Sequence, residues 1–124
     1  MTYKLYLIRV FSFKWEESRD FYKNTVGFPL QSEDEVLGWA QFDLGSAHLA
    51  IERCDPGDQE SNELVGRFVG TSIAVEDIQA VYQSLRSKGV EFTSPPEQQS
   101  WGGTLAHFKD PDGNIITLFG NGGT

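Results

Sequence analysis

The feature that most restricts the fold of this sequence is a strand–helix–hairpin pattern that occurs twice. The second copy ends at Asp110–Asn114, an Asp-Pro-Asp-Gly-Asn segment between the apolar runs 104–108 and 115–119. Proline presets φ, aspartate accepts hydrogen bonds from the backbone after it, and glycine tolerates positive φ. The segment therefore predicts a hairpin that joins two strands.

An earlier part of the chain follows the same plan. Runs 39–44 and 47–51 flank Gly45-Ser46, which predicts a shorter hairpin. Helical periodicity covers 14–26 before the first hairpin and 77–88 before the second, and a glycine follows each helix as a C-cap. Both copies therefore have the order β-α-β-β-β. The remaining strands are expected at 5–11, near 29–33, at 68–75 and at 90–92.

The repeat predicts the fold class, because one such module leaves a face of its sheet uncovered. Two modules side by side favour an α+β fold in which two βαβββ modules form a curved mixed sheet, with helices outside and a cleft inside. We expect a single domain over 1–124. Its parts are module one at about 1–54, a polar linker or mobile loop at about 55–66, module two at about 67–120, and a frayed tail at 121–124.

Composition and charge exclude several classes of function. The 124 residues are 39% hydrophobic and 13% aromatic, which suits one domain with a real core. The net charge is −8 and the ten basic residues form no stripe, so nucleic acid is not expected as a partner. No stretch is long enough for a membrane span, and no secretory signal is visible. The lone Cys54 allows no internal disulfide, so we expect a cytoplasmic protein with an inert thiol.

Several motifs together resemble the vicinal oxygen chelate superfamily. They are Ser-Arg-Asp-Phe-Tyr at 18–22, Val-Gly-Phe at 26–28, Val-Glu-Asp-Ile at 75–78, and Trp-Gly-Gly at 101–103 with the turn at 110–114. The superfamily includes glyoxalase I, bleomycin-resistance proteins, fosfomycin-resistance enzymes and extradiol dioxygenases. The motifs are turn and packing residues, so they indicate the fold and leave the reaction open. The resemblance also implies a homodimer.

Catalytic members of this superfamily hold a divalent metal with His and Glu side chains from four strands. Counting from the helix starts and from the last turn, those positions correspond to Leu7, Ala50, Gly70 and Thr117. The first three have no donor atom, and Thr117 has only a weak one. We therefore expect no metal and no other cofactor, as in the metal-free bleomycin-resistance members.

Strand alternation predicts which side chains face the cleft. Ala40, Phe42, Leu49, Ile51, Ala106, Phe108, Ile116 and Leu118 should pack on the helices. A few polar anchors in an apolar wall are typical of a small-molecule site. The candidate ligand-binding residues are Arg9, Trp39, Gln41, His48, Glu52, His107, Thr117 and Phe119 on the cleft side, with Trp101 either stacking on a ligand or marking a hinge or rim.

Other roles for these residues stay open. His48 could equally be a histidine near a sheet edge, and Arg9 could pair with Glu52, with Asp43 or with a ligand anion. His107, one strand from Thr117, is the candidate for acid/base catalysis. A metal site made of His48, Glu52 and His107 is an alternative on composition alone.

Three hypotheses follow for the function. We favour a metal-free protein that binds or sequesters a small planar or cationic molecule in its cleft, in the manner of antibiotic-resistance proteins. The second is a lyase, isomerase or dioxygenase that uses an atypical metal site or His107. The third is an interaction module without a small ligand.

Overall fold

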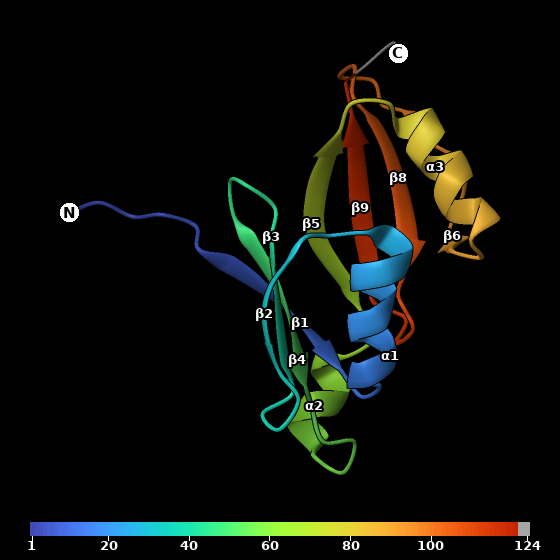
Figure 1. Cartoon of the computed structure of the whole chain (residues 1–124). Coiled ribbons are helices and arrows are strands. Elements are labelled where there is room, and N and C mark those ends of the chain that lie inside the picture. The colour runs from blue at the N-terminus through green and yellow to red at the C-terminus, as the bar shows by residue number, and fades with distance from the viewer. Residues whose placement is uncertain (122–124) are drawn as a thin grey trace. The chain divides into compact units, whose positions relative to one another are not determined.

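The computed structural model describes residues 1–121 and shows an α+β fold with two mixed β-sheets (Figure 1). The chain forms two compact units, Met1–Gly66 and a second that begins at Arg67. Each unit contains one sheet and the helix that packs on it. Among residues 1–121, no helix combines the length and apolar character needed to cross a membrane.

The first unit contains a four-stranded sheet. Its elements are β1 (Leu7–Ser12), α1 (Trp15–Asp20), the π-helical turn η1 (Phe21–Val26), β2 (Leu30–Asp34), β3 (Trp39–Asp43), β4 (His48–Arg53) and the short helix α2 (Gln59–Leu64). The strands lie in the order β1-β4-β3-β2. β1 and β4 are parallel, and the other neighbours are antiparallel.

The second unit repeats this arrangement. Its elements are β5 (Phe68–Val75), α3 (Ile78–Ser87), β6 (Glu91–Phe92), β7 (Glu97–Gln98), β8 (Thr104–Lys109) and β9 (Ile115–Gly120). The order β5-β9-β8-β6 matches that of the first sheet, and β5 and β9 are again parallel, which confirms the predicted repeat. The two-residue β7, which pairs with β8, was not predicted.

Several predicted boundaries need correction. β1 begins at Leu7, two residues later than expected, and the helix predicted over 14–26 changes at Phe21 from α to π hydrogen bonding. The segment predicted as a linker contains α2, whose N-cap Asp58 accepts a hydrogen bond from the Glu60 N–H at 3.2 Å. Of the predicted tail, 122–124 lie outside the described residues.

The predicted turn at 110–114 is held by the Asp110 side chain. Its Oδ1 accepts hydrogen bonds from the N–H groups of Asp112 and Asn114, both at 2.9 Å, and its Oδ2 accepts one from Asn114 Nδ2 at 3.1 Å. Asn114 in turn accepts a hydrogen bond from the Arg67 N–H at 3.3 Å. Gly113 has φ +83°, which its lack of a Cβ permits. The turn thereby connects the β8–β9 hairpin to the start of β5.

One face of each sheet packs against a helix. In the first unit, Ala40 and Phe42 on β3 are fully buried, and the Phe42 ring lies 6.3 Å from the rings of Tyr22 and Phe28. In the second unit, α3 presents Ile78, Tyr82 and Leu85 to β8 and β9, which supply the buried Ala106, Phe108, Ile116 and Leu118. This agrees with the packing face predicted from alternation.

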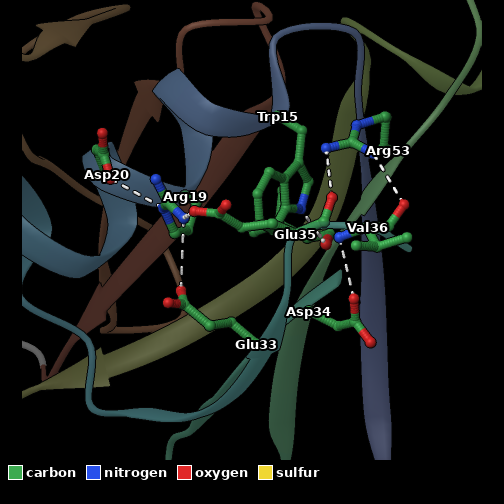
Figure 2. A network of polar contacts seen from close by, with 9 residues as sticks. Trp15, Arg19, Asp20, Glu33, Asp34, Glu35, Val36 and Arg53 are labelled. Carbon is green, nitrogen blue, oxygen red and sulfur yellow. Dashed lines mark hydrogen bonds and ion pairs between the residues drawn. The ribbon is translucent and has the colours of Figure 1, made fainter. Parts of the chain in front are cut away.

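A cluster around Trp15 connects α1 to the β2–β3 hairpin of the first unit (Figure 2). The buried indole donates to the Ile51 carbonyl at 3.0 Å and lies between the guanidinium groups of Arg19 and Arg53, 5.0 and 5.1 Å from its ring centroid. Arg19 bonds the Glu35 carboxylate at 3.0 Å, and this hydrogen bond raises the pKa of Arg19.

The Arg53 side chain bonds to the backbone of the same β2–β3 hairpin. Its guanidinium donates to the carbonyls of Glu35 at 2.9 Å and Val36 at 3.3 Å (Figure 2). Asp34 Oδ1 accepts hydrogen bonds from the N–H groups of Val36 and Leu37. The hairpin is therefore fixed from both sides of its turn.

Candidate functional site

The candidate ligand-binding residues of the first unit lie on the side of its sheet opposite the packing face of Ala40 and Phe42. The parallel register pairs Leu7 with His48, Arg9 with Ala50 and Phe11 with Glu52. The antiparallel register adds Trp39, Gln41 and Asp43, opposite Glu52, Ala50 and His48. Residues paired in register point to the same side of a sheet. We call this side the open face of the first unit, to distinguish it from the side on which Ala40 and Phe42 pack.

A hydrogen-bonded network occupies the centre of this open face. Trp39 Nε1 donates to Gln41 Oε1 at 3.1 Å, and Gln41 Nε2 lies 2.7 Å from His48 Nδ1 and 3.0 Å from the Tyr6 hydroxyl. His48 Nε2 lies 3.6 Å from Asp43 Oδ1. Gln41 is buried, with 6% of its surface exposed, while Trp39 and His48 are half-buried. These polar groups are thus ordered by one another.

A hollow of about 290 Å³ borders this network. Its lining comprises Lys4, Leu5, Tyr6 and the turn 45–48, which includes His48. The Tyr6 and His48 rings are 5.5 Å apart, centroid to centroid. Sequence reasoning missed Tyr6, because alternation from a strand starting at Leu5 assigns it to the packing face. In the structure it precedes β1, where the chain no longer follows strand alternation.

Arg9 and Glu52 lie elsewhere on the same open face. Arg9 Nη1 is 3.3 Å from Glu52 Oε1, so Glu52 is the partner among the three that the sequence left open. The Arg9 side chain is 54% exposed and also lies over the Phe11 ring at 5.2 Å. An ion pair this exposed contributes little to stability, so Arg9 can change partners at small cost.

The corresponding face of the second sheet holds the remaining candidates. The register pairs His107 with Thr117 and Leu105 with Phe119. His107 Nδ1 lies 2.8 Å from Thr117 Oγ1, and the Phe68 ring packs edge-on to the imidazole at 5.6 Å. Phe68 is thus a further residue of this face and is not among the candidates predicted from the sequence.

Trp101 stacks on Phe119 at the same face. The two ring centroids are 6.0 Å apart and the ring planes differ by 13°. The indole nevertheless remains 64% exposed, so one of its faces is available to solvent. Gly103 lies beneath it, and an added Cβ there would collide with the Trp101 ring.

The four positions that the resemblance assigns to a metal do not form a donor set that suits one. Leu7 and Ala50 lie on the open face of the first unit but carry no donor atom, and Thr117 bonds His107. Gly70 has φ +83° and lies where the β5–β9 register shifts, so the strand is irregular there. Within residues 1–121, no group of three or more His, Cys, Asp or Glu residues is placed to hold a metal ion.

Cys54 follows β4 and is partly buried. Burial raises the pKa of its thiol, and a hydrogen bond with Ser61 opposes this shift. A thiol of raised pKa is a weak nucleophile at neutral pH. The structure therefore provides no activated nucleophile at this position.

Comparison with known proteins identifies the family. Residues 6–118 match the model of the Glyoxalase/Bleomycin resistance protein/Dioxygenase superfamily. The chain belongs to this superfamily, in agreement with the strand order of its two units.

Its relatives include proteins with and without a known role. It is 46% identical over 106 residues to the uncharacterized protein YetH of Bacillus subtilis strain 168, covering 83% of this chain and 86% of that one. It is 36% identical over 119 residues to a bleomycin resistance protein of Klebsiella pneumoniae, covering 84% and 86%. The crystal structure of TnmS3, an antibiotic binding protein from Streptomyces sp. CB03234, superimposes with a TM-score of 0.76 at 30% identity, covering 97% of each chain.

Proposed function

We propose that this protein binds and sequesters a small planar or cationic molecule, without using a metal. The observation that carries the proposal is the side-chain chemistry at the family's metal positions, since Leu7, Ala50 and Gly70 offer no donor atom. Catalysis by a bound divalent ion needs several converging donors. A protein that only binds its ligand does not need them.

The open faces of the two units support a binding role. Half-buried aromatic rings and a small number of ordered polar groups are the usual composition of a small-molecule site. In the first unit these are Trp39, Gln41 and His48, and in the second Phe119 and His107. The identity to a bleomycin resistance protein and the likeness to an antibiotic binding protein favour an antibiotic or a molecule of similar chemistry. The net charge of −8 favours a cationic ligand at long range.

Native mass spectrometry of protein purified without an affinity tag tests this proposal. A panel of planar compounds, with cationic members, should yield at least one ligand that binds at one per chain and quenches tryptophan fluorescence. Elemental analysis of the same sample should give no stoichiometric divalent metal. A bound divalent ion at one per chain, or a panel without any ligand, would contradict the proposal.

Variants then show which open face contributes to binding. Gln41→Ala and Trp101→Ala each alter one face, whereas Gln83→Ala changes an exposed position on α3 and serves as the matched control. The proposal expects weaker binding for at least one of the first two and unchanged binding for the control. The predicted homodimer and cytoplasmic setting belong to the same proposal, and light scattering after size exclusion measures the first.

A second candidate function is metal-free acid/base catalysis by His107. The observation in its favour is the 2.8 Å contact between His107 Nδ1 and Thr117 Oγ1, which orients the imidazole on the open face. If the bound compound is converted over time, His107→Gln should stop the conversion and leave binding within a few-fold of the parent protein. Conversion that persists in His107→Gln would eliminate this candidate.

A further inference from the structure

The direction of each hydrogen bond in the Trp39–Gln41–His48 network follows from the one group that can only donate. An indole N–H has no acceptor role, so the Gln41 atom 3.1 Å from Trp39 Nε1 must be the amide oxygen. Turning the amide over would place its NH₂ group against the indole N–H. Because Gln41 is buried, water cannot compensate for such a pair of facing donors.

The orientation of Gln41 determines the protonation of His48. With its oxygen toward Trp39, the amide directs its NH₂ group at His48 Nδ1 and at the Tyr6 oxygen, 2.7 and 3.0 Å away. A neutral imidazole has one N–H and one acceptor nitrogen. Nδ1 is therefore the acceptor, and the ring proton is on Nε2.

Two donors remain after these contacts are made. His48 Nε2–H has no hydrogen-bond partner among the described residues, since Asp43 Oδ1 at 3.6 Å is beyond hydrogen-bonding distance and accepts from the Gly45 N–H at 2.8 Å. The Tyr6 hydroxyl accepts from Gln41 and so retains its own proton. Both residues line the same hollow of about 290 Å³.

We infer that Trp39 and Gln41 are positioning residues that hold His48 as its Nε2–H tautomer. The hollow then presents two hydrogen-bond donors, and it takes a planar ligand that bears a neutral acceptor oxygen, such as a ketone carbonyl. The ligand part of the inference rests on the proposed binding function. An ammonium group would face two donors here. Two charged side chains border these donors, Lys4 in the lining of the hollow and Asp43 at 3.6 Å from His48 Nε2, and their opposite signs favour neither a cation nor an anion. The local arrangement thus selects against the cation that the net charge of −8 would attract.

The tautomer is measured on the ligand-free protein, independently of any binding. At a pH where the imidazole is neutral, two-bond ¹⁵N–¹H correlation spectra distinguish a nitrogen that carries a proton from one that does not. We expect Nδ1 of His48 to be unprotonated and Nε2 to be protonated. Gln41→Glu presents only acceptors to His48 and should move the proton to Nδ1, whereas Trp39→Phe releases the amide and should give a mixture. A protonated Nδ1 in the parent protein, or the same tautomer in Gln41→Glu, would overturn the inference.

The ligand preference is tested with two probes of equal ring size and opposite hydrogen-bonding character. Acetophenone offers a carbonyl oxygen, and benzylammonium offers only donors. Followed through the His48 and Tyr6 signals, acetophenone should bind roughly 3- to 10-fold more tightly, the value of about one hydrogen bond. His48→Phe keeps a ring of similar size and should remove the difference.

The outcomes separate this inference from the proposed function. Tighter binding of benzylammonium at these signals, or no effect of either probe on them, would overturn the ligand preference. A panel of planar compounds that yields no ligand would instead contradict the proposed function, and the tautomer result would be unaffected. The two ideas therefore fail in different experiments.

Discussion

The turn at the end of the repeat permits a quantitative comparison between the two units. Asp110→Ala removes the hydrogen bonds that its carboxylate accepts from the N–H groups of Asp112 and Asn114 and from Asn114 Nδ2. Asn114 is fully buried and Asp110 is 6% exposed, so water cannot replace all of the lost acceptors. Hydrogen bonds to a charged group contribute about 1.5–3 kcal/mol each, and they are not additive in one turn, so we expect a loss of about 3 kcal/mol.

The matched control is the aspartate at the turn of the first hairpin. Asp43 Oδ1 accepts one backbone hydrogen bond, from Gly45 at 2.8 Å, and its side chain is 51% exposed. Asp43→Ala should therefore cost about 0.5 kcal/mol, because water takes over the single N–H. In thermal unfolding, the midpoints should fall by about 10–15 °C for Asp110→Ala and by about 2 °C for Asp43→Ala.

Urea unfolding of both variants gives the free energies that decide the comparison. The slopes with denaturant should equal that of the parent protein, so that the midpoints report stability. Asp110→Asn keeps the Oδ1 acceptor but places an NH₂ group against Asn114 Nδ2, so it should recover only part of the loss. If Asp110→Ala and Asp43→Ala differ by less than about 1 kcal/mol, burial does not determine the contribution of these turns and the reasoning is wrong.

Three further predictions concern packing, the thiol and the Trp15 cluster. Gly120→Ala should destabilise by about 1–3 kcal/mol in urea unfolding, because its Cβ would lie 2.8 Å from Ile78 Cγ2. Burial raises the pKa of the Cys54 thiol above its unfolded-state value. The stability that the thiol contributes is therefore present below the unfolded-state pKa and is lost as the pH rises through the folded-state pKa. Unfolding at alkaline pH measures this loss, and slow alkylation by iodoacetamide reports the raised pKa. Trp15→Phe should cost about 1–2 kcal/mol, since it leaves the Ile51 carbonyl without its indole donor.

Each of these three has a direct control. Gly57→Ala meets only ordinary contact and should leave the urea midpoint within error, so equal losses at both glycines would contradict the packing argument. Cys54→Ser should flatten the alkaline decline, and a decline of unchanged slope would assign it to other groups. Glu35→Gln breaks an exposed ion pair and should change stability by less than about 0.5 kcal/mol, well below Trp15→Phe.

The residues that could be predicted are those whose chemistry is local. The hairpins at 45–46 and 110–114 depend on turn residues, and the two faces of β3 and β9 depend on strict alternation, so both agree with the structure. The sequence periodicity cannot distinguish α from π hydrogen bonding, so the change at Phe21 was missed.

In the candidate site, the contacts that the sequence does not predict join residues that are far apart in the chain. Alternation assigns Gln41 and His48 to one face, but the contact of Gln41 with Tyr6 spans 35 residues and depends on where β1 begins. The pairing of Arg9 with Glu52 likewise depends on the parallel register of β1 and β4. No local pattern in the sequence specifies such a register, and only the assembled sheet makes these neighbours.

The alternation within β3 has a consequence for how such proteins diversify. Ala40 and Phe42 pack on the helix side of the sheet, while Gln41 between them lies on the open face, where the proposed function places ligand binding. Neighbouring codons thus serve separate selective pressures, one for a stable scaffold and one for a preferred compound. Substitutions on the open face of β3 can therefore change which compound is bound, while the residues that pack on the helix stay the same.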